Sequence, residues 1–208
     1  MNSNKANNAN RSIGLMVVTV AFAVGIGVGE VSGSGQYAYP IAANIVSSFA
    51  ATHSVYPATD IFAKCGAIVV APVSGSVNGL RRLDLWNKKT DNPWFRGGKF
   101  VSIVGIDGVR YYMAHLDTIN NGLKVDSGVQ VGQRIGTVGK TGRAGACHIH
   151  FGISPPCKNL EWWVRRGVVW PAKFLNAWRS GVGKSPVSAI RGWLQNNPKA
   201  CLNKGQMP

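Results

Sequence analysis

Acidic residues are scarce in this sequence. Of 208 residues, 8 are Asp or Glu, against 23 Lys and Arg, which gives a formal net charge of +15. The glutamates are Glu30 and Glu161, so the His-Glu-x-x-His helix that gives many metalloproteases their glutamate base is absent. The positive charge favours a polyanionic partner, such as nucleic acid, anionic lipid or an anionic cell wall, or it serves solubility alone.

Cysteine is also sparse, and no Cys-x-x-Cys pair occurs among Cys65, Cys147, Cys157 and Cys201. A zinc site built from four thiolates is therefore not expected. An even number of cysteines in an exported protein indicates two disulfides instead, and four cysteines allow three pairings.

Charged residues are missing from residues 12–29, a run that follows Lys5 and Arg11. A basic start followed by an apolar run is typical of an export signal. It is either a cleaved signal peptide, with Ala21-Phe22-Ala23 as the cleavage site, or an uncleaved membrane anchor. Eighteen helical residues would span about 27 Å, close to the hydrocarbon thickness of a bilayer. A buried core helix is the remaining alternative.

The first 52 residues are thus predicted to precede the main domain. Residues 1–30 form the signal peptide or anchor, and residues 31–52 form a linker in which Ile41 to Ala51 is compatible with a short helix. Basic residues before the apolar run place that end in the cytoplasm. The remainder is expected to be exported, either secreted or membrane-anchored with its domain outside the cytoplasm.

Residues 53–156 carry signals for strands. Short runs rich in β-branched and aromatic residues alternate with glycine. Asp107-Gly108 separates two such runs and predicts a tight hairpin. We therefore expect a mainly β fold: a compact antiparallel β-sheet domain with a substrate groove. The polar insertion from Leu80 to Gly98 is either a wall of that groove or a solvated loop.

Residues 157–208 are basic and are predicted to be helical. One helix is expected from Trp170-Pro171 to Trp178. A second should begin at Ser185-Pro186, with the serine as N-cap and the proline as the first helical residue. Val187, Ile190 and Leu194 then recur at helical spacing, which predicts a stripe that packs on the β-domain.

Histidine occurs four times, in three short segments. His148 and His150 are two residues apart in a strand-like run, so both side chains point to one face. His115 lies near the end of another run, and a turn can bring His53 and Asp60 together. A single histidine would be an ordinary surface or core residue, but two imidazoles with one carboxylate make a catalytic zinc site.

The same segments contain motifs that resemble the lysostaphin-type (LytM-like) zinc endopeptidases, which are peptidoglycan hydrolases. The matching blocks follow the family's order over residues 53–154: His53-x6-Asp60, Ala71-Pro72-Val-Ser-Gly75-Ser-Val77, Tyr112-Met-Ala-His115-Leu116, Val131-Gly-Gln133-Arg-Ile-Gly136-x-Val-Gly139-x-Thr-Gly142 and His148-Ile-His150-Phe-Gly152. One departure is the spacing of seven between His53 and Asp60, where the family's usual spacing is four.

The resemblance implies one Zn²⁺ per chain, with His53, Asp60 and His150 as metal ligands and His115 and His148 as catalytic residues. With no glutamate available as base, a histidine must take or shuttle the proton. The implied substrate is the peptide part of peptidoglycan, and anionic wall polymers and the membrane are further expected partners.

Two other functions compete with this one. A non-catalytic cell-wall-binding or regulatory module on the same fold would lack metal ligands, whereas this chain keeps a full set. A nucleic-acid binder is supported by charge and aromatics alone, without a recognition motif, so no nucleic-acid partner is expected.

The implied site also predicts the disulfide pairing. Segments that meet at one metal bring their neighbouring cysteines close, which favours Cys65–Cys147. A Cys157–Cys201 bond would pin the C-terminal tail to the β-domain. Free buried thiols are the alternative.

Overall fold

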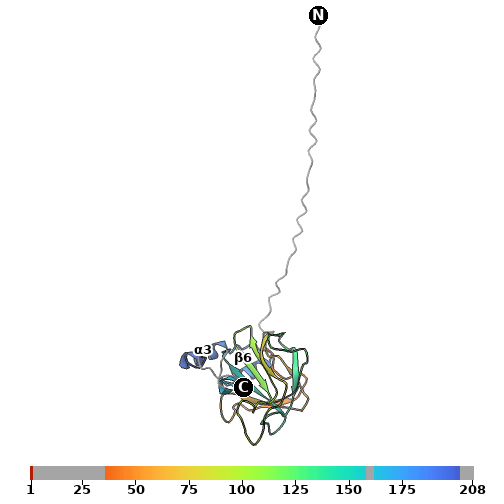
Figure 1. The fold of residues 1–208 in the computed structure, drawn as a ribbon. Helices are drawn as coiled ribbons and strands as arrows, with labels where there is room; N and C mark the ends of the chain where they lie inside the picture. Colours follow the sequence, from red (N-terminus) through yellow and green to blue (C-terminus); the bar gives the residue numbers. More distant parts are fainter. Residues whose placement is uncertain (2–35, 158–161, 202–208) are drawn as a thin grey trace. The chain divides into compact units, whose positions relative to one another are not determined.

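A computed structural model describes Met1, residues 36–157 and residues 162–201 (Figure 1). Apart from Met1, the predicted export segment lies outside these residues. Within the described ranges, no helix has the length and apolar character needed to cross a membrane.

Two antiparallel sheets make up the domain. In the described residues the strands are β1 (Ser47–Phe49), β2 (Thr59–Ala63), β3 (Ile68–Val70), β4 (Gly75–Arg81), β5 (Phe100–Gly105), β6 (Arg110–Ala114), β7 (Leu116–Ile119), β8 (Gly128–Val129), β9 (Arg134–Val138) and β10 (His148–Ser154). The larger sheet has the order β1-β2-β10-β6-β5-β4-β8, and the smaller has the order β3-β9-β7. The predicted mainly β fold is confirmed.

Strand alternation in the larger sheet separates the core from the functional face. Ile149, Phe151 and Ile153 of β10 are fully buried in the main hydrophobic cluster, together with Tyr111 and Met113 of β6. Because successive side chains of a strand point to opposite faces, the alternate residues of β10 project from the other face. The histidines of β10 are among them.

The short helix α1 (Trp162–Arg166) lies against that other face. Its last carbonyl approaches β10 so closely that a Cβ at position 152 would clash with the carbonyl oxygen of Arg166. Gly152 is therefore required for α1 to reach the sheet, and all seven residues of β10 are buried.

The predicted hairpin joins β5 to β6. Val104 pairs with Arg110 across the ladder, and Gly108 adopts φ = 72° in the turn, a conformation that glycine accepts without strain. Asp107 fixes the turn from within, since its Oδ1 accepts the backbone N–H of Val109 at 3.1 Å.

The C-terminal helices pack as the sequence predicts, but one boundary differs. They are α2 (Ala172–Arg179) and α3 (Val187–Asn196) (Figure 1). Ile190 is buried, and Val187 and Leu194 pack partly buried against the core, which confirms the predicted stripe. Helix α3 begins at Val187 with Pro186 as its N-cap, one residue later than predicted, although Ser185 Oγ accepts the N–H of Val187 at 3.3 Å, as an N-cap serine would.

The region expected to be a linker is partly packed. Tyr37 and Ile41 belong to the main core cluster, so the packed domain begins before residue 53. The short helix expected between Ile41 and Ala51 is wrong, since this stretch contains β1, whose residues pair with β2. A distant strand supplied hydrogen bonds that local sequence cannot reveal.

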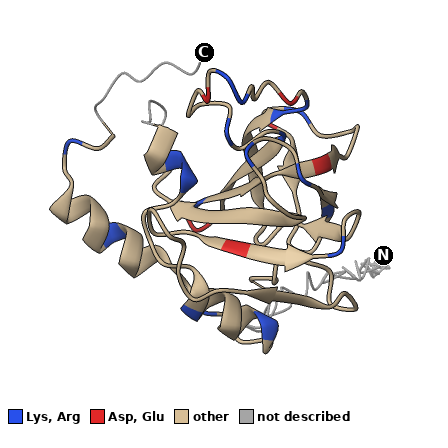
Figure 2. Cartoon of the chain, turned by 90° about the horizontal axis from the view of Figure 1, so that it is seen from below, with Lys and Arg blue, Asp and Glu red and all other residues tan. Residues whose placement is uncertain are grey.

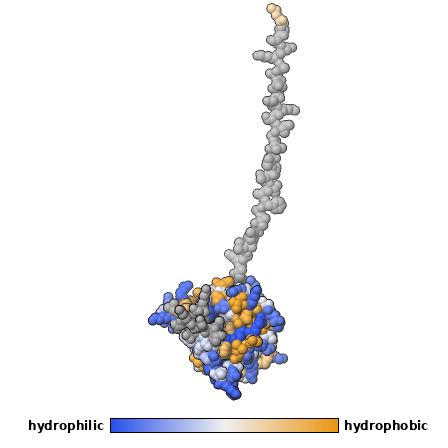
Figure 3. Space-filling view, viewed as in Figure 1, coloured by the Kyte–Doolittle hydropathy of each residue, from blue (hydrophilic) through white to orange (hydrophobic). Residues whose placement is uncertain are grey.

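Both predicted disulfides are present, Cys65–Cys147 and Cys157–Cys201. Lys and Arg are distributed over loops and helices in the view of Figure 2, without gathering on one element. On the face shown in Figure 3, hydrophobic side chains lie between hydrophilic ones.

Candidate metal centre and catalytic cavity

The carboxylate of Asp60 is the hub of the site. Asp60 on β2 pairs directly with His150 on β10, so both side chains leave the same face of the sheet. Asp60 Oδ1 lies 3.1 Å from His150 Nδ1 and 3.7 Å from His148 Nε2, and Oδ2 lies 4.0 Å from His53 Nε2. Burial alone raises the pKa of a carboxyl group, but the hydrogen bond from His150 and the neighbouring imidazoles bring the pKa of Asp60 down to about 2.

Three of these side chains fit a metal ion. His53, Asp60 and His150 each offer one ligand atom, and these atoms all lie within 4.8 Å of one another. Two imidazole nitrogens with one carboxylate oxygen are a donor set typical of catalytic zinc, which leaves a coordination position open for water. This part of the chain therefore has the composition and convergence of a metal site.

The tautomer of His150 also suits a ligand. Its Nε2 lies 3.0 Å from the carbonyl oxygen of Arg166, and a carbonyl can only accept. Nε2 therefore carries a proton; Nδ1 donates to ionised Asp60 when the ring is doubly protonated, and in the neutral ring its lone pair is the one that a metal can take. A backbone carbonyl behind a ligating imidazole is a common arrangement in metal sites, where it fixes the ring and its tautomer.

His53 is held differently. Its Nδ1 accepts the backbone N–H of Val55 at 3.3 Å, so in the neutral ring the proton sits on Nε2. A metal can bind His53 Nε2 only after this long hydrogen bond is released and the proton moves to Nδ1. Burial and the neighbouring His150 lower the pKa of His53, which keeps the ring neutral, as a metal ligand must be.

His115 and His148 form a second pair beside the carboxylate, with ring centroids 4.7 Å apart. His115 Nδ1 lies 2.7 Å from the carbonyl oxygen of Thr141, and His148 Nδ1 lies 2.8 Å from that of Ala146. Each Nδ1 therefore donates to a carbonyl, and each Nε2 is left available for proton exchange in the cavity.

The backbone at His115 is unusual. It adopts φ = 62°, a left-handed conformation that residues other than glycine rarely adopt and that costs energy. The residue sits between the end of β6 and the start of β7, and its N–H donates to the carbonyl of Gly97 at 2.9 Å. Burial, followed by the charges of His150 and His148, lowers the pKa of His115 to about 3.

The insertion between residues 80 and 98 is a wall of the cavity. Arg96 donates two hydrogen bonds to Asp91, at 2.9 and 2.7 Å, and Arg143 from the facing loop donates a third at 2.9 Å. Asp84 accepts the N–H of Gly142 at 2.8 Å. These contacts fasten the insertion to the loop that precedes β10, and both arginines line the cavity.

The cavity has a volume of about 500 Å³ and contains all five predicted residues on its walls. Three further lining residues were not singled out as site residues from the sequence: Tyr56, Tyr112 and Arg166. The hydroxyl of Tyr112 is buried without a hydrogen-bond partner. Tyr112 belongs to the motif Tyr112-Met-Ala-His115-Leu116, so the sequence could have indicated it as a site residue. Nothing in the local sequence indicates Arg166.

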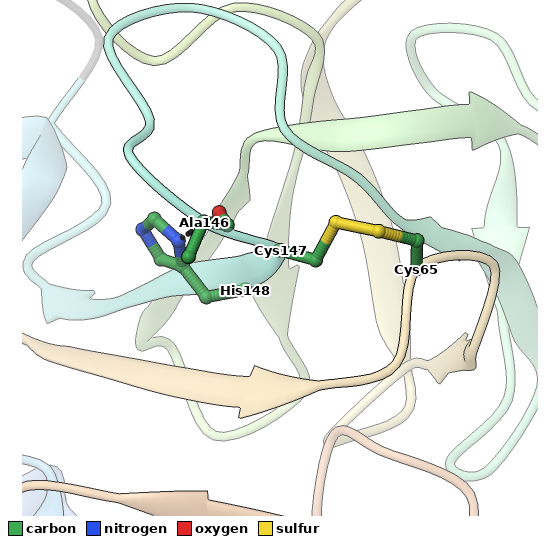
Figure 4. The surroundings of a disulfide bond; sticks show 4 residues. All are labelled: Cys65, Ala146, Cys147 and His148. Carbon is green, nitrogen blue, oxygen red and sulfur yellow. Dashed lines mark hydrogen bonds between the residues drawn. A yellow bond between two sulfur atoms is a disulfide. The ribbon is translucent and has the colours of Figure 1, made fainter.

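One disulfide supports the site from behind. Cys147 immediately precedes His148, and Cys65 follows β2, the strand that carries Asp60. Figure 4 shows the bond between them beside His148 and its carbonyl partner Ala146. The bond ties together the two strands that carry the cavity's carboxylate and two of its imidazoles.

Comparisons with known proteins find similar sequences. A model of peptidase family M23 matches residues 54–161. The chain is 28% identical over 144 residues to an L-Ala–D-Glu endopeptidase of Bacillus subtilis (strain 168), covering 62% of this chain. The match spans 41% of that relative's length.

Solved structures show the same fold. Lysostaphin from Staphylococcus simulans is similar with a TM-score of 0.53 and 23% identity, covering 74% of this chain and 57% of lysostaphin. Its catalytic domain alone gives a TM-score of 0.47 and 25% identity, covering 68% of this chain and 89% of that domain.

Proposed function

The chain belongs to peptidase family M23, and on that basis we propose that it is a zinc-dependent endopeptidase that hydrolyses peptide bonds in peptidoglycan. The observation that carries the proposal is that three imidazoles are each hydrogen-bonded to a backbone carbonyl. His115, His148 and His150 each donate one ring N–H to a backbone carbonyl, so each has its other nitrogen available in the cavity that all three line. A site that bound only a wall polymer would not need this control of tautomers.

The proposed ligands of a single Zn²⁺ are His53, Asp60 and His150. Bound zinc supplies Lewis-acid chemistry, which activates water and polarises the scissile carbonyl. Asp60 is ionised at neutral pH because of its low pKa, and His150 is oriented by its bond to Arg166. Asp60 meets the requirement that a ligand be unprotonated at the coordinating atom, neutral His150 meets it at Nδ1, and His53 meets it once its proton has moved from Nε2 to Nδ1.

Proton transfer is proposed to belong to His115 and His148. His115 is neutral at physiological pH because its pKa is strongly lowered, so its Nε2 can accept a hydrogen bond from the attacking water and orient it as it gives up its proton. His148 Nε2 faces the same carboxylate from 3.7 Å and can take the proton from that water and then pass it to the leaving amine. Such acid and base groups typically contribute 10²- to 10⁴-fold to a rate.

The family and the two disulfides point to an exported protein, since disulfides persist in oxidising surroundings. Peptidoglycan then is the proposed substrate, and anionic wall polymers are proposed as secondary partners of a chain with a net charge of +15. Attachment to the membrane through residues 1–30 is also proposed, with a cleaved signal peptide as the alternative.

Hydrolysis of purified peptidoglycan tests the function. The enzyme is treated with a chelator, assayed, and assayed again after zinc is returned, and the released fragments are identified by mass spectrometry. We expect zinc-dependent release of new amino termini, which identifies the peptide bond that is cut. The matched control is His150→Ala. Wall binding without any zinc-dependent hydrolysis would contradict the proposal and support a non-catalytic wall-binding module.

A further inference from the structure

A second cavity of about 390 Å³ lies on the same face of the larger sheet as the catalytic one. The ladder between β10 and β6 pairs His150 with Ala114 and Ser154 with Arg110. Because residues separated by two share a face, Arg110 projects on the side of His150, about 13 Å further along the strands. The second cavity therefore continues the face that carries the catalytic histidines.

The floor of this cavity contains a buried cation. Arg110 is 4% exposed, and its Nη2 donates to the carbonyl of Cys157 at 2.5 Å. When the amide of Asn78 donates to Ser102, its oxygen accepts from Arg110 Nε at 3.2 Å and from Nη2 at 3.0 Å. These partners are all neutral, and no carboxylate of the described residues forms an ion pair with Arg110.

A second guanidinium borders the same cavity. Arg165 of α1 is 3% exposed, and its guanidinium carbon lies 4.8 Å from the ring centre of Phe100, 5.3 Å from that of Tyr112 and 5.4 Å from that of Trp94. Burial, and then repulsion by Arg165, lowers the pKa of Arg110 to about 10. Arg110 thus stays charged at neutral pH, although a buried charge without an opposite charge is costly.

We propose that this cavity binds a carboxylate group of the peptide that the enzyme cleaves. Since Nε and Nη2 of Arg110 already donate to Asn78 and Cys157, Nη1 is the guanidinium nitrogen left to donate to a carboxylate oxygen, and such a charge-assisted hydrogen bond is stronger than a neutral one. An incoming carboxylate would supply the opposite charge that the neutral partners of Arg110 do not. Trp94 and the hydroxyls of Ser76 and Ser102 line the remaining space.

Helix α1 links this cavity to the catalytic one. Because the bound carboxylate is assigned to the peptide that is cleaved, the inference rests on the proposed function. The consecutive residues Arg165 and Arg166 of α1 line the second and the catalytic cavity, respectively. An extended peptide advances about 3.3–3.6 Å per residue, so the 13 Å offset corresponds to about four residues. The bound carboxylate is therefore expected about four residues from the cleaved bond.

Binding to metal-free protein tests the inference without hydrolysis. Calorimetry compares a peptidoglycan stem peptide with free carboxylates against the same peptide with carboxamides, using wild-type protein and Arg110→Gln. We expect Kd for the acidic peptide to rise at least tenfold in the variant, with the Kd for its amide changed less than twofold. Equal losses for both peptides, or no loss, would overturn the inference.

A second variant covers the case in which Arg110→Gln does not fold. Ser76 is exposed at the cavity rim, so Ser76→Glu can place a carboxylate near Arg110 without removing a buried group. The Ser76→Glu variant should raise Kd for the acidic peptide at least fivefold and leave Kd for the amidated peptide unchanged. Arg191→Gln, at an exposed position on α3, is the matched control for one lost positive charge and should bind like wild type.

Two further measurements separate the sources of failure. Inorganic phosphate is titrated alone. If Arg110→Gln weakens the binding of phosphate but not the binding of the acidic peptide, the cavity is a site for free anions and the inference is overturned. Zinc-dependent cleavage of the amidated peptide is assayed in parallel. If the wild type cleaves neither the peptide nor peptidoglycan, the proposed function is wrong. The calorimetry then still tests whether the cavity binds a carboxylate.

Discussion

Removing the Cys65–Cys147 disulfide is expected to lower the free energy of unfolding by about 4.5 kcal/mol and also to weaken metal binding. The bond joins residues separated by 82 positions. The loop-entropy relation for a closed loop of that length gives about 4.5 kcal/mol at 25 °C. The double substitution Cys65→Ser, Cys147→Ser releases this constraint from the unfolded chain, and it also frees the segment that leads into His148.

The other disulfide provides a matched control. Cys157–Cys201 closes a separation of 44, for which the same relation gives about 4.0 kcal/mol. The two double variants should therefore lose similar stability. Because the control bond touches neither β2 nor the start of β10, we expect zinc affinity to fall about tenfold or more only when Cys65–Cys147 is removed, as for other groups that support metal ligands.

Two assays measure these effects separately. Urea unfolding with a chelator present reports stability, and with a slope of about 2 kcal/mol per molar urea each variant's midpoint should fall by about 2 M. Competition with a chromophoric chelator reports zinc affinity in native buffer. Equal loss of zinc affinity in the two variants, or none in either, would refute the idea that the Cys65–Cys147 bond positions the metal site.

The histidine and aspartate assignments lead to further predictions. Asp60→Ala and His150→Ala should each lose zinc and all hydrolysis, because too few ligands remain; stoichiometric zinc by elemental analysis would exclude that residue as a ligand. In His53→Ala the same analysis should show zinc loss, and retained zinc would indicate a different third ligand. His115→Ala and His148→Ala should keep zinc but hydrolyse peptidoglycan about 100-fold or more slowly, and zinc loss in either would move it into the ligand set. The metal-free protein should also lose stability as pH falls from about 6.5 toward 3, since the unfolded chain binds a proton that buried His115 does not. The loss at pH 5 is about 2 kcal/mol. When urea unfolding is repeated across this pH range, the free energy of unfolding of His115→Gln should depend less steeply on pH than that of the wild type. An unchanged pH dependence would contradict the role of His115.

Local patterns in the sequence were enough for the fold class and for several elements. The hairpin at Asp107-Gly108 follows from the backbone preferences of two residues. The common face of His148 and His150 follows from the two-residue period of a strand. The helix that begins near Pro186 was predicted within one residue, because its stop and start signals lie in the same short segment.

Features that depend on distant segments were missed. Residues 41–51 contain β1 rather than a helix because β2 supplies their partners. Nothing in the sequence distinguishes Arg110, Arg165 and Arg166 from the other Lys and Arg residues of a chain that has 23. Only packing shows that these three are buried on one face of the sheet, since burial depends on what α1 and the insertion loop cover.

The sequence by itself determined which chemical groups could form a site: four imidazoles, a carboxylate in a motif, and cysteines placed to join the segments that carry them. The tertiary structure decided which nitrogen of His115, His148 and His150 is available. That choice depends on the backbone carbonyls of Thr141, Ala146 and Arg166. Apart from Ala146, these carbonyls come from segments distant in sequence from their histidines, so only the folded chain brings each acceptor to its ring.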